Sequence, residues 1–378
     1  MTANASAFVP QPDGGVWDRA DATTAGFDAG RLAEAVAFAE AHDSHFPRGF
    51  YYPDGRYVGI VEWNEKGPWS EVSGLVRERG GPSGLILKGG RIVAEWGDTV
   101  RADMTFSVAK SYLAVLAGLA IDQGLITSVD EPLGASVKGP WFESAHNAQI
   151  TWRHLLQQSS EWDGVLWEKS DQVDHFRNVA TGSDNSKKGD LRQRQTPGNY
   201  YEYNDVRVNL LALSLLLRFR RALPEVLAER VMAPIGASRS WEWHGYRTSF
   251  IEIDGRRVQS VSGGAHWGGG MFISARDQAR LGLLVARGGR WGGTQVLSGK
   301  WLANMVEPSP TNGGYGLLWW LNRGKGRRTA WSESCISAMG AGQNLIWIDP
   351  TRDIVVVLRW IDKTKVTPFL DQLAAAVR

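Results

Sequence analysis

Segments with the character of β-strands lie near both ends of this 378-residue chain, and mostly helical segments lie between them. Residues 83–97 predict two strands joined at Gly89-Gly90, a pair typical of hairpin turns. Residues 344–359 predict two further strands, because they contain short β-branched and aromatic runs. From about 105 to 250 the spacing of apolar residues is mostly helical. This order predicts an α+β fold in which one sheet is built from both ends and a helical domain is inserted.

We expect the following domain organisation. Residues 1–25 are polar and rich in proline and glycine, which is typical of a loosely attached N-terminal arm. Residues 26–104 and 251–378 are predicted to form the domain that contains the sheet, and residues 105–250 the mostly helical domain. The active site is expected in the cleft between the two domains. A long polar stretch over 160–200 predicts a functional loop, because long loops in compact domains often carry function.

Composition excludes several classes of function. The net charge of +2, without a dense run of Lys and Arg, argues against nucleic-acid binding. No stretch reaches the roughly 18 apolar residues of a membrane span, and the N-terminus does not resemble a signal peptide, so we expect a cytoplasmic protein. The single cysteine, Cys335, excludes an internal disulfide and a multi-cysteine metal site. The seven histidines are scattered and form no H-E-x-x-H motif, so we expect neither a metal nor a cofactor.

The motif Ser-x-x-Lys, from Ser107 to Lys110, begins an apolar stretch with helical character over 107–121. Residues three apart lie on the same face of a helix, so the lysine amine is expected beside the serine hydroxyl. A serine becomes a good nucleophile when a neighbouring group helps to remove its proton. Chance alone supplies roughly one such motif in a chain of this length, so further residues must support the interpretation.

A second candidate is Tyr203, which stands just before a predicted helix that begins at Asp205. Its ring can project from the start of that helix into a cleft. A tyrosinate beside a lysine ammonium is a plausible general base, because the positive charge stabilises the phenolate. The alternative is that Tyr200, Tyr201 and Tyr203 are packing aromatics.

A third candidate is the glycine-rich segment 334–350, which predicts a strand edge that enters a hairpin. Glycine permits close backbone approach, which suits an N–H group that stabilises a developing oxyanion. The alternative is an ordinary strand or bulge that contains glycine.

Together the three segments resemble the serine β-lactamase and penicillin-binding-protein superfamily. The most similar branch is class C-like and includes class C β-lactamases, family VIII carboxylesterases and 6-aminohexanoate-dimer hydrolases. The resemblance covers about residues 80–360 and also includes I-T-W-R-H-L-L-Q-Q-S-S and G-G-G-M-F-I-S-A-R-D-Q-A-R-L-G. It implies a β-lactamase/transpeptidase-like fold, in which helices flank an antiparallel sheet, and a serine hydrolase that acts through an acyl-enzyme.

The resemblance also implies roles for individual residues. Ser107 corresponds to the acylated nucleophile and Lys110 to its activating partner. Tyr203 corresponds to the general base that later returns its proton to the leaving group. The oxyanion hole is expected at the backbone N–H groups of Ser107 and Ala341. A backbone N–H at a helix N-terminus suits this role independently, because of its partial positive charge.

Two departures from the family pattern bear on the substrate. Asp205 stands where the family usually has asparagine, which places a carboxylate near Lys110 or else provides a helix cap. The family's Lys-Thr-Gly motif is replaced by Ala338-Met339-Gly340, which removes the lysine that helps to hold a β-lactam carboxylate. We therefore expect an esterase or a hydrolase of amide oligomers rather than an efficient β-lactamase.

Further substrate-binding candidates are His266 and Trp267, which lie in a glycine-rich turn expected to approach the cleft. His266 is equally well explained as a turn or packing residue. Several of the 18 tryptophans lie in segments that the family places near the cleft: Trp162, Trp167, Trp267, Trp319, Trp320 and Trp331. Each of them taken singly is more often part of a core. Trp162, Trp167, Asp205, Met339 and Gly340 complete the predicted substrate-binding set.

The sequence thus predicts a serine hydrolase that acts on small esters or amides, with a class C-like β-lactamase or D,D-peptidase as the alternative. A Ser-His-Asp triad is disfavoured, since no G-x-S-x-G motif occurs. A non-catalytic ligand-binding member is disfavoured because Ser107, Lys110 and Tyr203 are all present. We expect a small-molecule substrate and neither a nucleic-acid nor a membrane partner, and a homodimer remains open.

Overall fold

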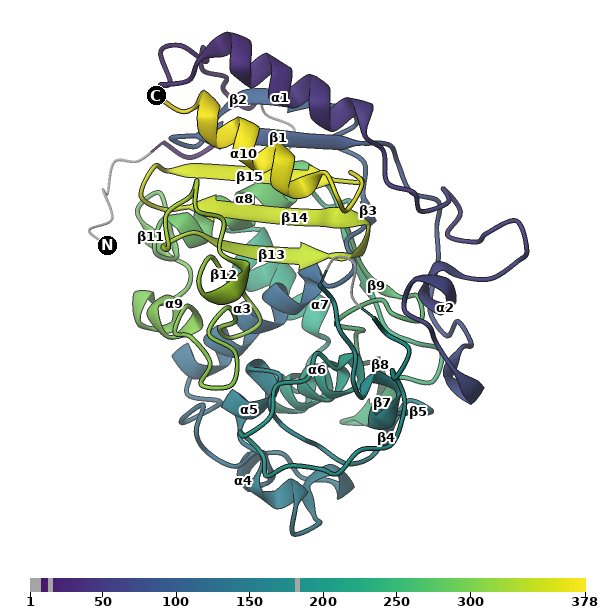
Figure 1. Ribbon diagram of the computed structural model, residues 1–378. Helices are drawn as coiled ribbons and strands as arrows, with labels where there is room; N and C mark the ends of the chain where they lie inside the picture. Colours follow the sequence, from purple (N-terminus) through teal and green to yellow (C-terminus); the bar gives the residue numbers. More distant parts are fainter. Residues whose placement is uncertain (1–7, 13–15, 181–183) are drawn as a thin grey trace.

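The computed structural model describes residues 8–12, 16–180 and 184–378. A six-stranded antiparallel sheet lies in the upper half of the view in Figure 1. Its strands follow in the order β12 (Trp320–Leu321), β13 (Ile336–Gly340), β14 (Asn344–Asp349), β15 (Ile354–Arg359), β1 (Ser83–Lys88) and β2 (Arg91–Trp96). Ser83 pairs with Arg359, so the sheet joins segments from the two ends of the chain, as predicted.

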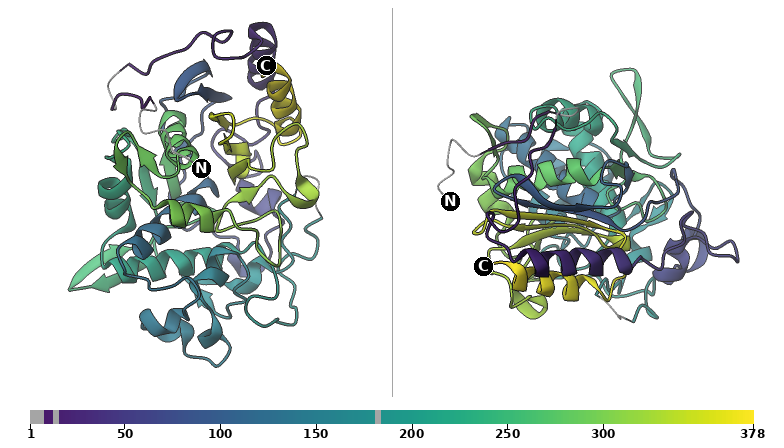
Figure 2. Two further views of the ribbon diagram at one scale, coloured as in Figure 1. Left: turned by 90° about the vertical axis from the view of Figure 1, so that its left-hand side faces the viewer. Right: turned by 90° about the horizontal axis from the view of Figure 1, so that it is seen from above.

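Helices cover both faces of this sheet. On one face α1 (Ala29–Ala41) packs beside α10 (Val366–Ala376), and on the other face α8 (Ala275–Ala286) lies against the central strands (Figure 2). Side chains alternate between the two layers, as the pleat of a strand requires. Trp347 belongs to the core under α1 and α10, whereas Ile346 belongs to the core on the α8 side. The predicted α+β fold is confirmed.

The helix that carries the Ser-x-x-Lys motif is α3 (Val108–Asp122), which packs against both β13 and α6 (Asp205–Phe219). Residues 108–120 are all buried, which explains why their sequence is apolar on every side apart from Lys110 and Ser111. Gly118 permits a close approach, because a Cβ atom there would overlap the indole ring of Trp301. The helix therefore connects the sheet to the helical region through the middle of the molecule.

The other helices are short. They are α2 (Val58–Glu62), α4 (Leu133–Ser136), α5 (Trp152–Leu156), α7 (Leu223–Leu227) and α9 (Gly299–Met305). Residues 225–232 are α-helical only at their start, because α7 ends at Leu227 and a π-helical turn follows over Ala228–Met232.

The remaining strands form small sheets. A three-stranded sheet contains β3 (Asp103–Met104), β9 (Gly270–Ile273) and β6 (Glu242–His244). Two-stranded sheets pair β4 (Val165–Leu166) with β5 (Lys169–Ser170), β7 (Phe250–Ile253) with β8 (Arg256–Gln259), and β10 (Arg290–Trp291) with β11 (Thr294–Gln295). The segment 251–378, predicted to belong to the domain with the sheet, thus begins with a separate hairpin. The largely exposed side chains of this hairpin do not suit a sheet covered on both faces. The predicted domain boundaries remain a prediction.

The predicted N-terminal arm falls partly on residues 1–7 and 13–15, which lie outside the described residues. Its described part is attached to the β1–β2 hairpin. Trp17 is buried, and its indole N–H donates to the carbonyl of Gly90 at 2.9 Å.

In the part of the chain that the structure describes, no helix combines the length and the apolar character needed to cross a bilayer.

Candidate active site

Ser107 stands immediately before α3, and Lys110 lies one helical turn further on. Lys110 Nζ donates a hydrogen bond of 2.8 Å to Ser107 Oγ, so the helical spacing brings the two side chains together as predicted. Lys110 is only 1% exposed. Lys110 is also the one side-chain hydrogen-bond partner of Ser107 Oγ among the described residues.

The backbone turn before the nucleophile is strained. Phe106 has a φ of +48°, in the left-handed region that bulky side chains rarely adopt, at a cost of roughly 1–3 kcal/mol. Its ring contacts four other aromatic rings, those of Phe46, Phe50, Trp63 and Trp360. These contacts hold the turn in place and thereby fix the position of Ser107 at the start of α3.

Asp205 lies beside Lys110 and is not the helix cap. Its Oδ1 is 2.5 Å from Lys110 Nζ, and both side chains are buried. Asn204 caps α6 instead, because its side chain accepts a hydrogen bond from the N–H of Arg207. Burial alone would raise the pKa of Asp205, but Lys110 and Arg177 hold that pKa well below its usual value. Asp205 therefore holds Lys110 as a buried ion-pair partner, which differs from the substrate-binding role predicted for it.

Tyr203 lies between two cations at the wall of the site. Its ring centroid is 4.7 Å from Lys110 Nζ and 5.4 Å from the guanidinium carbon of Arg177. Its ring also stacks on Trp320, with centroids 5.8 Å apart and an interplanar angle of 24°. Two cations thus lie within cation–π distance of the ring of this tyrosine.

Gly340 ends β13 directly against the nucleophile turn. A Cβ atom at this position would lie 3.0 Å from the backbone nitrogen of Ser107, and still closer to the carbonyl oxygen of Thr105. Only glycine permits this approach. Ala341 follows and lines the same cavity as Ser107, so the two N–H groups predicted for the oxyanion hole lie on neighbouring backbone segments.

A cavity of about 830 Å³ opens at Ser107. Much of its wall is aromatic, with contributions from Phe46, Trp63, Phe106, Phe176, Tyr200, Tyr201, Tyr203 and Trp320. Met339 and Gly340 also line it, whereas Ala338 is buried in the core. The chain lacks the lysine of the family's Lys-Thr-Gly motif, but the cavity wall still carries positive charge. Arg328 and Lys363 both line the cavity.

Most of the predicted cleft tryptophans lie in protein cores. Trp320 lines the cavity, but Trp162, Trp267, Trp319 and Trp331 are at most 2% exposed and are packed in core clusters. Trp167 is half-buried and packs against the main core. The positions of Trp162, Trp167 and Trp267 thus do not support the substrate-binding roles predicted for them, because an indole is large and apolar enough to serve as core anywhere in the chain.

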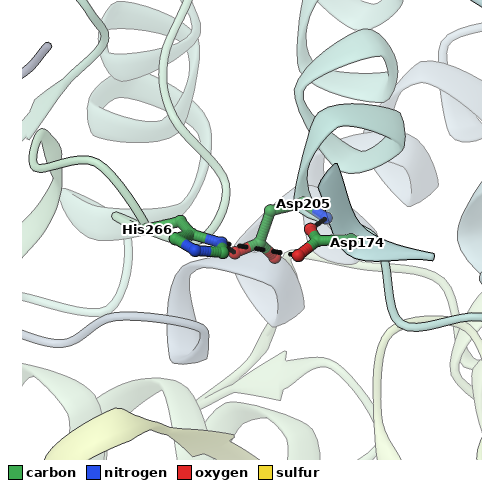
Figure 3. Close-up of side chains that lie close together, drawn as sticks. All are labelled: Asp174, Asp205 and His266. Carbon is green, nitrogen blue, oxygen red and sulfur yellow. Dashed lines mark hydrogen bonds and ion pairs between the residues drawn. The ribbon is translucent and has the colours of Figure 1, made fainter. Parts of the chain in front are cut away.

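His266 is buried behind Asp205 and does not line the cavity. Its Nδ1 is 3.3 Å from Asp205 Oδ2, and its Nε2 is 2.5 Å from Glu65 Oε2. Figure 3 shows the imidazole pointing at the carboxylate of Asp205, with Asp174 on the far side. This position corrects the prediction that His266 binds substrate, because the ring has no exposed edge.

The sequence did not predict the other charged residues of this region. Asp174, Arg177 and Lys188 come from the polar stretch 160–200, where Asp174 ends a 3₁₀ turn (Asp171–Asp174), and Glu65 comes from the segment after α2. The length of that polar stretch was the single signal available for them, since neither segment has a periodic pattern.

Side-chain atoms of Asp174, Asp205 and His266 lie within 4.8 Å of one another, a spacing that can hold a metal ion. The carboxylates, however, already have cationic partners. Lys110 and Arg177 contact Asp205, and Arg177 and Lys188 contact Asp174. A divalent cation would be repelled by these three charges, so the donor set does not fit a metal.

Comparison with known proteins places this site in a family. The family model Beta-lactamase matches residues 73–365. Among solved structures, EstCE1, a hydrolase with promiscuous acyltransferase activity, superposes with a TM-score of 0.58 at 16% identity, over 92% of this chain and 98% of that chain. A penicillin-binding protein homologue from Caulobacter crescentus gives 0.57 at 14% identity, over 86% and 98% of the two chains. A family VIII carboxylesterase gives 0.56 at 15% identity, over 93% and 98%.

At these identities the solved structures establish the fold, which agrees with the one expected from the sequence. The family model spans well over half of the chain and includes the segments that carry Ser107, Lys110, Tyr203 and Gly340. The protein belongs to the beta-lactamase family, whose members are serine hydrolases that include esterases, amidases and β-lactamase-like enzymes.

Proposed function

We propose that the protein cleaves small esters or amides through an acyl-enzyme on Ser107. The observation that supports this most is the 2.8 Å hydrogen bond from Lys110 Nζ to Ser107 Oγ at the wall of a cavity of about 830 Å³. A cavity of this size suits a small organic substrate. The serine, the buried cation and Tyr203 together supply a nucleophile and a proton acceptor.

In the proposed reaction, Ser107 Oγ attacks the carbonyl carbon of the substrate and its proton passes to Tyr203. The tetrahedral intermediate then expels the leaving group, which takes that proton from Tyr203. Water repeats the same steps on the acyl-enzyme and releases the acid. Lys110 is held by its ion pair with Asp205, at 2.5 Å, and donates a hydrogen bond to Ser107 Oγ. In this arrangement Tyr203 accepts the hydroxyl proton of Ser107.

The oxyanion is proposed to lie between the backbone N–H groups of Ser107 and Ala341. The close approach of Gly340 to the turn before Ser107 supports this placement. N–H groups that are fixed before the reaction stabilise the developing negative charge without reorganisation, an effect typically worth about 3 kcal/mol for one donor.

The aromatic wall and the apolar Met339 favour an uncharged ester or amide near the nucleophile. A class C-like β-lactamase or D,D-peptidase is the second candidate. Arg328 and Lys363 favour it, because a cation on the cavity wall can hold a substrate carboxylate.

A fluorophosphonate probe followed by intact-mass measurement tests the acyl-enzyme. We expect one covalent adduct on the wild-type protein and none on Ser107→Ala. Ser111→Ala is the matched control, because Ser111 lies one turn further along α3 and its buried hydroxyl donates to the carbonyl of Leu318. This control should still be labelled. Folded wild-type protein without an adduct would rule out the proposed function.

Rates on p-nitrophenyl butyrate, nitrocefin and the 6-aminohexanoate dimer separate the substrate classes. We expect ester or amide cleavage to exceed nitrocefin turnover by at least about tenfold in kcat/KM, equal to 1.4 kcal/mol of transition-state stabilisation. Fast nitrocefin turnover with slow ester cleavage would favour the second candidate instead.

A further inference from the structure

The turn that carries Ala341 lies beyond the paired part of the sheet. Gly340 pairs with Asn344 at the end of the β13–β14 ladder, and the residues between them lie outside that ladder. Gln343 has a φ of +57°, in the left-handed region that side chains rarely adopt. The sheet therefore does not fix the direction of the Ala341 backbone, and contacts outside the ladder must do so.

The side chain of Asn344 closes this turn. Its Nδ2 donates a hydrogen bond of 2.7 Å to the carbonyl oxygen of Ala341, and the whole residue is buried. On the other side of Ala341, the tight contact of Gly340 with the nucleophile turn fixes the preceding peptide. The Ala341 backbone is therefore held at both ends, and its N–H group cannot rotate freely.

Arg359, the last residue of β15, decides which way the Asn344 amide points. Its Nε donates to Asn344 Oδ1 at 2.8 Å. An amide side chain accepts through its oxygen and donates through its nitrogen, whereas a guanidinium can only donate. The oxygen must therefore face Arg359, and the NH₂ group is left for the carbonyl of Ala341.

The same guanidinium holds the segment that leads to Ser107. Arg359 Nη2 donates to the carbonyl oxygens of Asp103 and Met104, at 2.8 and 2.9 Å, and Nη1 donates to the carbonyl of Ile273. Asp103 and Met104 form β3, from which the chain continues through two residues to Ser107. One buried side chain thus connects both backbone segments of the proposed oxyanion hole.

Trp360, the next residue, contacts the same two segments. Its indole N–H donates to Asp103 Oδ2 at 2.8 Å, and its ring centroid is 6.4 Å from that of Phe106 in the nucleophile turn. On the side of Ala341, a Cβ atom on Gly342 would overlap the Trp360 ring. The turn and the nucleophile segment are therefore packed against one common side chain.

We propose that Asn344 is a positioning residue of the oxyanion hole, because its amide, oriented by Arg359, fixes the Ala341 N–H in the direction that the oxyanion requires. The inference deepens the proposed function and rests on it, since it concerns the same acyl-enzyme reaction. Acylation and deacylation both pass through a tetrahedral oxyanion, so the amide supports both steps. Asn344 itself does not line the cavity and acts through the backbone of Ala341.

Asn344→Asp tests this role with almost no change of shape. The carboxylate keeps its hydrogen bond from Arg359 and stays ionised beside that cation, but it cannot donate to the carbonyl of Ala341. We expect kcat on p-nitrophenyl butyrate to fall about tenfold, less than the roughly 100-fold typical of losing an oxyanion donor outright. KM should not change, because acylation and deacylation slow by the same factor.

Rates are expressed per active site, counted with the fluorophosphonate probe. Asn147→Asp is the matched control, because Asn147 is also buried and donates to two backbone carbonyls, those of Trp141 and Asp163, but does not line the cavity. It should keep the wild-type kcat. If Asn344→Asp does not fold, Asn344→Ala removes the same donor without adding a charge and should show the same fall in kcat.

A merely structural role for Asn344 would lower the number of labelled sites or the stability and leave kcat per site unchanged. That result, or a rise in KM at constant kcat, would overturn the inference. Absence of an adduct on the folded wild-type protein would refute the proposed function and the inference with it. A labelled wild type with unchanged kcat in the Asn344 variant refutes the inference alone.

Discussion

Lys110 Nζ and Asp205 Oδ1 are 2.5 Å apart in a site where both side chains are 1% exposed. The same ammonium group donates a hydrogen bond to Ser107 Oγ. The carboxylate of Asp205 therefore fixes the position of the lysine that contacts the nucleophile. In a buried pair of this kind, removal of one charge is more damaging than the net contribution of the pair suggests, because the other charge is left without compensation.

Asp205→Asn is therefore expected to lower the free energy of unfolding at pH 7 by about 3 kcal/mol, although asparagine has nearly the same shape. Denaturant titration measures this loss. Asp163→Asn is the control, because Asp163 is 62% exposed and pairs with Arg194 at the surface. That control should change stability by less than about 1 kcal/mol. Equal effects of the two substitutions would contradict the role assigned to Asp205.

The contact between Gly340 and the nucleophile turn predicts a loss of activity on a minimal substitution. In Gly340→Ala the added methyl group would meet the backbone of Thr105 and Ser107, and the backbone must shift to accommodate it. A displacement of the order of 1 Å at the nucleophile is expected to reduce kcat/KM about 100-fold. Gly293→Ala, where the added Cβ atom would meet no heavy atom within 4 Å outside its two chain neighbours, should leave kcat/KM unchanged. Full activity of Gly340→Ala would refute the proposed oxyanion hole.

Local patterns in the sequence predicted much of the fold and the reacting groups. The spacing of Ser107 and Lys110 and the helix start after Tyr203 are visible over a few residues. The structure places Ser107 and Tyr203 on the wall of one cavity, with Lys110 in contact with both. The joining of strands from both ends in one sheet followed from the position of the strand segments, and its antiparallel pairing was implied by the family resemblance.

Several charged residues in the region around Asp205 could not be predicted in the same way. Glu65, Arg177 and Lys188 come from irregular segments, where no period shows which way a side chain points. His266 was assigned to the cleft because its turn is rich in glycine, but that turn buries the ring instead. The tryptophans were ambiguous for a different reason. A large apolar indole suits the wall of a cavity and the interior of a core equally well, so the residue type does not tell the two positions apart.

The cations on the cavity wall predict a preference among substrates. Arg328 and Lys363 line the cavity, and the guanidinium of Arg328 packs over Trp347 without a carboxylate partner within 4 Å among the described residues. Arg328→Gln should raise KM about tenfold for an ester that ends in a carboxylate and leave KM for a neutral ester unchanged. Arg256→Gln, an exposed position on β8, is the control and should alter neither value. An equal rise in KM for both esters would show that Arg328 does not select charge.

A second buried acid, Glu161, predicts how stability depends on pH. It pairs with Arg192 and, at 3.0 Å, with Arg207, and so ties the polar stretch 160–200 to α6. Burial opposes ionisation of Glu161, but the two arginines outweigh it and lower the pKa to about 2. Because the folded pKa lies below the usual glutamate value of about 4.3, the stabilisation is complete above that value and is lost as the pH falls towards 2.

Glu161→Gln removes this titration. Denaturant titrations of the wild type and the variant should differ by about 3 kcal/mol at pH 7, and the difference should shrink steadily below about pH 4. Glu225→Gln is a suitable control, because Glu225 is 64% exposed and its ion pair with Arg221 is 3.9 Å long. It should cost little at any pH. A difference between wild type and Glu161→Gln that stays constant down to pH 3 would mean that the glutamate acts through packing alone, because only a carboxylate that gains a proton over this range loses its ion pairs.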